Sequence, residues 1–91
     1  MNKIFVSYYP FTYDQPIACL DEEGNTIEST MVKLDDVPLA IQIFCKKYNT
    51  KDVVLVGNQN ILEHFKSELN TKFSNDNLNV EIMVPTTNAI K

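Results

Sequence analysis

The sequence predicts an α/β domain with a mixed five-stranded sheet of order 3-2-1-4-5 and two helices. Three short strand-like segments come first, and two segments with helical periodicity then alternate with two further strands. The continuous apolar run at 53–56 is typical of a parallel strand buried on both faces. Because strand–helix–strand units cross over right-handedly, the last two strands lie parallel to each other and to the first strand.

The first three strands are predicted to form a meander. The first spans residues 3–9, where the residue pattern suits a central strand covered on both faces, and Pro10 ends it. The second strand runs through 17–20. A hairpin turn at 21–25 holds one of the two glycines at positive φ, and the third strand then returns antiparallel at 26–33.

The first helix is predicted by a capping signal followed by apolar residues at helical spacing. Asp35 or Asp36 is the expected N-cap, and Pro38 falls in the first turn. Asn49 is expected to close the helix in the left-handed region. The apolar positions that define the buried stripe are Val37, Ala40, Ile41, Phe44, Cys45 and Tyr48.

The second half of the chain repeats this strand and helix alternation. The strand at 52–57 ends in a glycine, and Asn58 or Asn60 is the expected cap of a second helix. Residues 78–84 alternate cleanly as a final strand, which Pro85 ends. The stripe of the second helix consists of Ile61, Leu62, Phe65, Leu69 and Phe73.

Length and composition predict one ordinary globular domain. The 91 residues are 44% hydrophobic and 22% charged, and we expect a single domain at 1–85 with a tail at 86–91. No apolar run is long enough for a membrane span, and the first residues become polar too soon for a signal peptide, which predicts a cytoplasmic protein. Cys19 and Cys45 sit in apolar stretches and are expected to be reduced core thiols, with a disulfide as the alternative.

The charge pattern disfavours nucleic acid as a partner. The net charge is −4, and all eight basic residues are lysines, so the chain lacks the bidentate guanidinium that grips phosphates and guanine edges. A local lysine patch, and with it a degenerate nucleic-acid-binding domain, remains an alternative. Ten asparagines among many lysines and isoleucines indicate an AT-rich coding genome, such as that of a low-GC bacterium, its phage or its mobile elements.

A three-strand meander followed by helix, strand, helix and strand resembles the ribonuclease H-like fold over about residues 2–85. The resemblance implies a nuclease with carboxylates in the first strand, on the first helix and after the fourth strand, because two divalent metals need bridging acids. Here those places hold Ser7, the acid-free segment 39–48, and Val56-Gly57-Asn58. The chain is therefore similar to a minimal, catalytically degenerate member, and we predict no enzyme, no metal site and no cofactor. The final helix of larger members is missing, so one sheet face is expected to be thinly covered.

Four aromatic rings around the first strand connection are the leading candidate site. Tyr8, Tyr9, Phe11 and Tyr13 fall within six residues, and tyrosine is enriched at protein interfaces. The alternative is that Tyr8 and Phe11 fold back over the end of the sheet. The leading hypothesis is a non-catalytic protein-binding domain, accessory or inhibitory, whose partner is a host or phage protein or a second copy paired through the edge strand at 78–84.

The second hypothesis is a small-ligand or nucleotide-binding domain. Gly57, Asn58 and Gln59 turn from a buried strand into a helix beside Ser7, where open α/β sheets bind ligands. This ligand-binding hypothesis predicts that Gly57→Val removes the thermal stabilisation that the ligand causes, while the fold survives. The alternative is that an asparagine here merely caps the helix. His64 lies away from the apolar stripe and is expected to be solvated.

Overall fold

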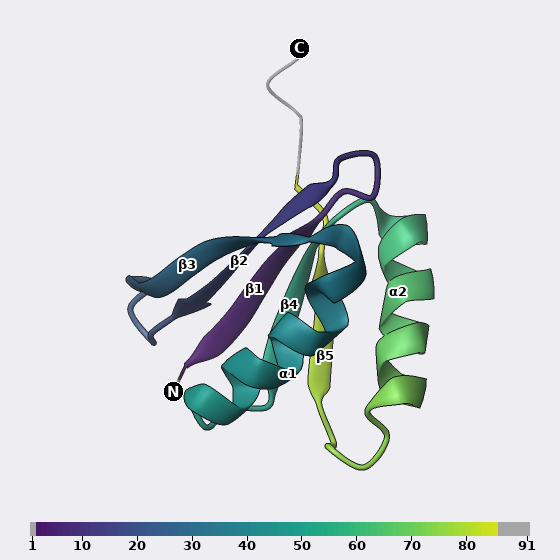
Figure 1. The fold of residues 1–91 in the computed structure, drawn as a ribbon. Coiled ribbons are helices and arrows are strands. Elements are labelled where there is room, and N and C mark those ends of the chain that lie inside the picture. Colours follow the sequence, from purple (N-terminus) through teal and green to yellow (C-terminus); the bar gives the residue numbers. More distant parts are fainter. Residues whose placement is uncertain (1, 86–91) are drawn as a thin grey trace.

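The computed structural model describes residues 2–85 and contains the expected mixed sheet, with strands in the order β3-β2-β1-β4-β5 (Figure 1). The pairs β1–β2 and β2–β3 are antiparallel, whereas β1–β4 and β4–β5 are parallel. The predicted tail lies outside the described residues. The elements are β1 Lys3–Tyr8, β2 Asp14–Leu20, β3 Thr26–Lys33, the 3₁₀ turn η1 Leu34–Asp36, α1 Val37–Lys47, β4 Asp52–Gly57, α2 Gln59–Lys72 and β5 Asn79–Met83.

The β2–β3 turn forms as its sequence predicts. Gly24 has a φ of 87°, which a glycine adopts without the steric cost of a side chain. The Asp21 carboxylate accepts hydrogen bonds from the backbone N–H groups of Glu23 and Asn25, each at 2.9 Å. This side-chain bridge is an Asx-type turn that aligns the two antiparallel strands.

Both helices have a predicted residue at the N-cap position, but only one of the two makes a capping hydrogen bond. Asn58 caps α2, and its side-chain oxygen accepts the backbone N–H groups of Asn60 and Ile61. At α1 the N-cap position is Asp36, but its side chain makes no capping bond. The chain enters α1 through η1, so Asp36 has a ψ near 0° rather than the extended conformation of a capping residue. Asn49 takes the predicted left-handed conformation after α1, with a φ of 52°.

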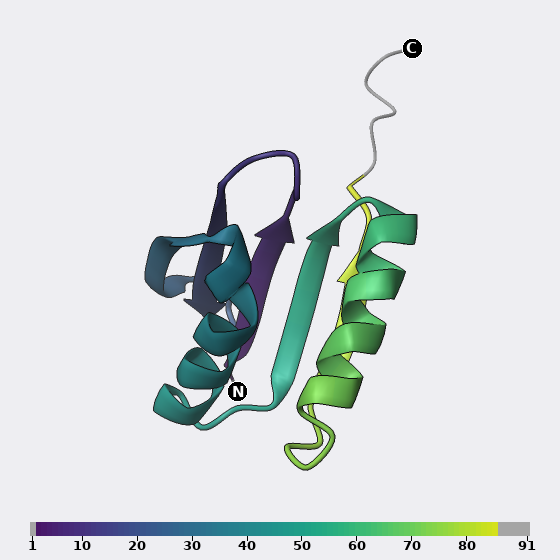
Figure 2. The same ribbon diagram turned by 45° about the vertical axis from the view of Figure 1, so that its right-hand side comes forward.

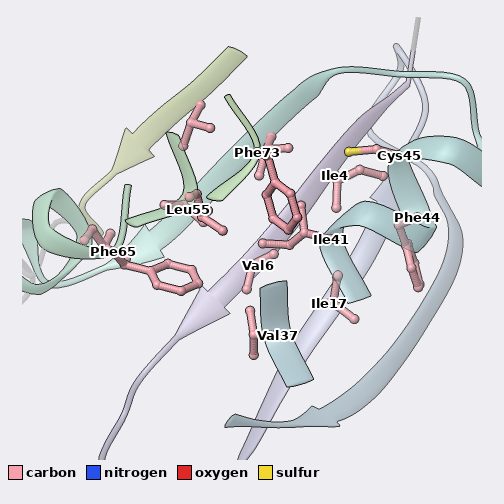
Figure 3. Packing of buried hydrophobic residues seen from close by; sticks show 14 of the residues in the cluster. Ile4, Val6, Ile17, Val37, Ile41, Phe44, Cys45, Leu55, Phe65 and Phe73 are labelled. Atoms are coloured by element: carbon pink, nitrogen blue, oxygen red, sulfur yellow. The ribbon is translucent and has the colours of Figure 1, made fainter. Parts of the chain in front are cut away.

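Both helices lie on the same face of the sheet (Figures 1 and 2). The crossovers β3–α1–β4 and β4–α2–β5 both progress toward β5, so the right-handed rule places both helices on one side. Figure 3 shows side chains from the helices and the strands packed into one cluster. Its fully buried members include Ile4, Val6, Ile17, Cys19, Val37, Ile41, Val53, Leu55, Leu62 and Leu69. The prediction that β1 is covered on both faces is therefore wrong.

The other side of the sheet, here called the open face, carries no helix from residues 2–85. Strand alternation places on it the residues between the core positions, of which about half are apolar and the rest are polar or charged. Met31 on β3 is 57% exposed and Met83 on β5 is 49% exposed, whereas Val54 on β4 is buried by its strand neighbours. The apolar members of the open face are Phe5, Pro16, Ala18, Leu20, Met31, Val54, Val56 and Met83.

A polar contact ties edge strand β3 to the end of α1. The Glu28 carboxylate accepts a hydrogen bond from Lys47 Nζ at 2.8 Å and a second from the Tyr48 hydroxyl. The two donors come from the last turn of α1 and its C-cap, and the acceptor comes from the middle of β3. The contact therefore links the end of α1 to the meander.

The Glu28 contact is expected to stabilise the fold at neutral pH and to lose that effect in acid. Hydrogen bonds from Lys47 and Tyr48 hold the pKa of the Glu28 carboxyl below its ordinary value. Its contribution is therefore present above the ordinary carboxyl pKa and is lost as the pH falls through the lower folded value. The test is the difference in melting temperature between the wild type and Glu28→Gln, measured at about pH 7 and at about pH 3. The difference should shrink in acid, and an unchanged difference would contradict the assignment.

Candidate functional site

The connection between β1 and β2, residues 9–13, is here called the aromatic loop. Three of its rings point into solvent: Tyr9 is 42% exposed, Phe11 86% and Tyr13 65%. Because Tyr8 at the end of β1 pairs with Gly57 at the end of β4, the loop lies at the same end of the sheet as the start of α2 (Figure 1). The sequence-predicted aromatic cluster is thus largely presented to solvent at one end of the sheet.

Tyr8, the fourth predicted partner-binding residue, behaves differently from the loop. Its ring stacks on Phe65 of α2, with the ring centroids 4.0 Å apart and the planes 7° from parallel. Burial raises the pKa of the Tyr8 hydroxyl, with smaller contributions from Glu68 and Asp35. The sequence left open whether Tyr8 and Phe11 fold back over the end of the sheet. Tyr8 does so, whereas Phe11 is exposed.

A buried glutamine holds the aromatic loop in place. Gln15 at the start of β2 is fully buried, and its Oε1 accepts the Tyr9 N–H at 2.6 Å. Its Nε2 donates to the Tyr9 and Thr12 carbonyl oxygens, both at 2.8 Å. The side chain thus satisfies backbone groups on both sides of the loop, as a paired strand would.

Sequence reasoning missed Gln15, although the strand pattern contained the signal. Gln15 alternates with Ile17 and Cys19, both of which point into the core, so the period of two places it inward as well. A buried polar side chain in a strand needs hydrogen-bond partners, and a neighbouring loop is the nearest source of them.

Further contacts fix the two sides of the aromatic loop. The Thr12 hydroxyl hydrogen-bonds to the carbonyl oxygens of Tyr9 and Asp14, at 3.1 Å each. The Tyr13 carbonyl accepts the N–H of Leu34 at 2.8 Å, and Lys33 Nζ lies 5.4 Å from the centroid of the Tyr13 ring. The exposed rings are therefore carried on an ordered backbone, which lowers the entropic cost of binding.

A shallow groove of about 510 Å³ begins beside the aromatic loop. His64 and Glu68 stand on its α2 side with side chains 80% and 61% exposed, and the His64 Nε2 lies 3.6 Å from a Glu68 oxygen. His64 is solvated, as predicted. The groove is lined by Tyr8, Pro10, Asn60, Ile61, His64, Phe65 and Glu68.

The structure does not bring the four predicted ligand-binding residues together. Asn58 uses its side-chain oxygen as the helix cap, and the Gln59 amide donates to Glu63 at 2.6 Å. Ser7 alternates with core residues of β1, so it lies on the open face, opposite α2. Gly57 remains at the junction, where it passes close to the backbone of Tyr8.

A second hollow of about 500 Å³ lies at the opposite end of the sheet, between the α1–β4 and α2–β5 connections. No sequence pattern predicted it, because its lining comes from two connections far apart in the chain. Cys45 lines it, and burial raises the pKa of that thiol to about 11. Cys19 and Cys45 are both free and buried, as expected for core thiols.

Neither a metal site nor a membrane-spanning helix is found among residues 2–85. Within residues 2–85, no group of three or more His, Cys, Asp or Glu side chains is arranged to hold a metal ion. No helix in the same range is long and apolar enough to cross a membrane. A scan against protein-family models and a search of curated proteins find no match for this chain.

Proposed function

We propose that this chain is a small non-catalytic protein-binding domain, accessory or inhibitory in role, that holds its partner through the aromatic loop. The observation that carries the proposal is the combination of exposed rings at Tyr9, Phe11 and Tyr13 with a loop backbone fixed by the buried Gln15. Large rigid rings on a preordered loop are the features of strong interface anchors.

The surroundings of the loop support a partner surface with basic groups. Asp14 follows the loop and is exposed, and Glu68 stands exposed across the groove on α2. The groove beside Tyr8 offers a recess for one partner side chain next to the projecting rings. A protein that presents an apolar pocket rimmed by lysine or arginine would match this arrangement.

The same reasoning extends to the origin of the domain. The strand order supports membership of the ribonuclease H-like fold, as a minimal member whose nuclease positions hold Ser7 and Asn58 in place of carboxylates. The asparagine-rich, arginine-free composition supports a phage or mobile-element protein acting in the cytoplasm of a low-GC bacterium. A role in redirecting a host protein is consistent with both.

Removing the two most exposed rings is expected to abolish partner capture without unfolding the domain. Phe11→Ser with Tyr13→Ser deletes two anchors, each worth about 2 kcal/mol or more at an interface centre, so binding should fall at least about 100-fold. The measurement is retention of host proteins from lysate of a low-GC bacterium, followed by titration with the purified retained protein.

A matched control distinguishes binding through the aromatic loop from nonspecific hydrophobic binding. Leu39→Ser with Ile43→Ser removes two half-exposed apolar side chains from the outer side of α1 and leaves the loop intact. Capture by the wild type and this control, but not by the loop variant, supports the proposal. Equal capture by all three, at matched melting temperatures, refutes it.

A further inference from the structure

We infer that the groove beside the aromatic loop binds the guanidinium group of an arginine side chain on the partner protein, with Glu68 as the carboxylate that receives it. The inference rests on the proposed function, because the groove adjoins the aromatic loop and the arginine belongs to the protein that the loop holds. It goes further than that proposal by assigning one side-chain type to one recess. The groove has a volume of about 510 Å³, and Tyr8, Phe65 and Glu68 all line it.

The Glu68 carboxylate is available to a ligand. It stands on α2 at the wall of the groove, and its side chain is 61% exposed. The His64 Nε2 lies 3.6 Å from a Glu68 oxygen, which is too long for a hydrogen bond, and no other group within residues 2–85 donates to this carboxylate. Two parallel N–H groups of a guanidinium match the two oxygens of such a carboxylate.

The charge around the groove is negative. Burial raises the pKa of the Tyr8 hydroxyl, and the Glu68 and Asp35 carboxylates add to that rise. Glu68 belongs to α2 and Asp35 to η1, so negative charge acts on the hydroxyl from two elements. Among the described residues that line the groove, none is a lysine. A cation therefore complements this site, whereas an anion would be repelled.

The aromatic wall of the groove favours arginine over lysine. The Tyr8 ring stacks on Phe65 with the ring centroids 4.0 Å apart, and Pro10 also lines the groove. A guanidinium is planar and weakly hydrated, so it packs against such rings while its edge bonds to a carboxylate. A lysine ammonium is a compact and strongly hydrated charge, and a shallow groove would not replace its water. We therefore expect the groove to discriminate between the two cations.

The groove and the exposed rings lie close enough to contact one partner at the same time. Pro10 belongs to the aromatic loop and lines the groove, while Tyr9 and Phe11 on either side of it are exposed. A partner that covers these rings therefore places its own surface over the groove. An arginine at the rim of the partner's apolar pocket would then face Glu68.

Capped amino acids test the groove without the partner. N-acetyl-arginine amide, titrated to about 50 mM at constant ionic strength, should shift the backbone amide signals of Ile61, His64 and Phe65 in a saturable manner. N-acetyl-lysine amide should bind at least about fivefold more weakly, and N-acetyl-citrulline amide, which has a similar shape without the charge, should not bind. Equal binding of the lysine and arginine probes, or the absence of a saturable shift with the arginine probe, overturns the inference.

Two glutamine variants on α2 identify the carboxylate. Glu68→Gln removes the charge from the groove and should weaken binding of the arginine probe at least about tenfold. Glu63→Gln makes the same change on the same helix outside the groove lining and should leave binding unchanged. Both side chains are exposed, so melting should show folded variants. An arginine probe that binds Glu68→Gln as tightly as the wild type contradicts the assignment.

The loop variant separates this inference from the proposed function. Phe11→Ser with Tyr13→Ser leaves the groove lining unchanged, so it should bind the arginine probe as the wild type does. A wild type that holds its partner through the loop but does not bind the arginine probe refutes the groove inference alone. A wild type that binds the probe through Glu68 but captures no partner supports the arginine site and refutes the proposed function.

Discussion

Replacing Gly57 with Ala is expected to destabilise the domain by about 3 kcal/mol, combining the strain of a positive φ with local overpacking. Gly57 has a φ of 154°, and an added Cβ would lie 2.8 Å from the carbonyl oxygen of Tyr8. That oxygen is backbone on the neighbouring parallel strand, so it cannot move aside as a side chain can. Chemical denaturation measures the loss.

Gly24→Ala is the matched control for this prediction. Gly24 also has a positive φ, of 87°, but nothing lies within 4 Å of the position of an added Cβ. Its cost should be only the conformational term of about 1–2 kcal/mol. Equal losses at Gly24 and Gly57 would contradict the role given to the Tyr8 carbonyl. The same contact means that Gly57→Val should unfold the domain, contrary to the expectation that the fold survives this substitution.

Gln15→Leu is expected to cost about 3 kcal/mol and to loosen the aromatic loop, because partly buried backbone groups lose the hydrogen bonds of the Gln15 side chain. The leucine fills the space but leaves the Tyr9 N–H and the Tyr9 and Thr12 carbonyl oxygens without the bonds that Gln15 supplies. Denaturation measures stability, and hydrogen exchange at Tyr9 and Thr12 measures the loop. Unchanged exchange in a destabilised variant would show that other contacts hold the loop.

Gln15→Glu is the sharper comparison, because it keeps the shape and the acceptor for the Tyr9 N–H. A buried carboxylate cannot donate to the Tyr9 and Thr12 carbonyl oxygens, and it carries an unpaired charge. Burial raises the pKa of the introduced carboxyl, so protonation in acid should restore one donor and part of the stability. Stability relative to the wild type should therefore rise as the pH falls, whereas Gln15→Leu should show no such recovery.

Most of the elements follow from local pattern. The period of two in the strands, the apolar stripes of the helices and the Asn58 cap are confirmed by the structure. Asp36 occupies the predicted N-cap position, but its side chain makes no capping bond because the chain enters α1 through a 3₁₀ turn, which the local signal did not distinguish.

The candidate site was predicted in composition but not in mechanism. The aromatic residues of 9–13 were recognisable from their density, yet only the fold shows that Tyr8 turns inward onto Phe65 while Phe11 remains outside. Only the structure shows that Gln15 supports the loop, because its inward-pointing side chain accepts a hydrogen bond from the backbone N–H of Tyr9. Such a contact depends on three-dimensional proximity between groups that no spacing rule connects.

The sequence by itself determined the order of elements, the order of the strands and the absence of carboxylates at the positions of the resembled nucleases. The order of elements and strands follows from hydrophobic periodicity, turn residues and the right-handedness of crossovers, which are local patterns or general rules. The absent carboxylates can be read directly from the sequence. Only the tertiary structure decided that Tyr8 stacks on Phe65, that Gln15 bonds to the backbone of the aromatic loop, and which strand residues stand side by side on the open face. Those results depend on strand register and on proximity between groups far apart in the chain, which are properties of the assembled sheet.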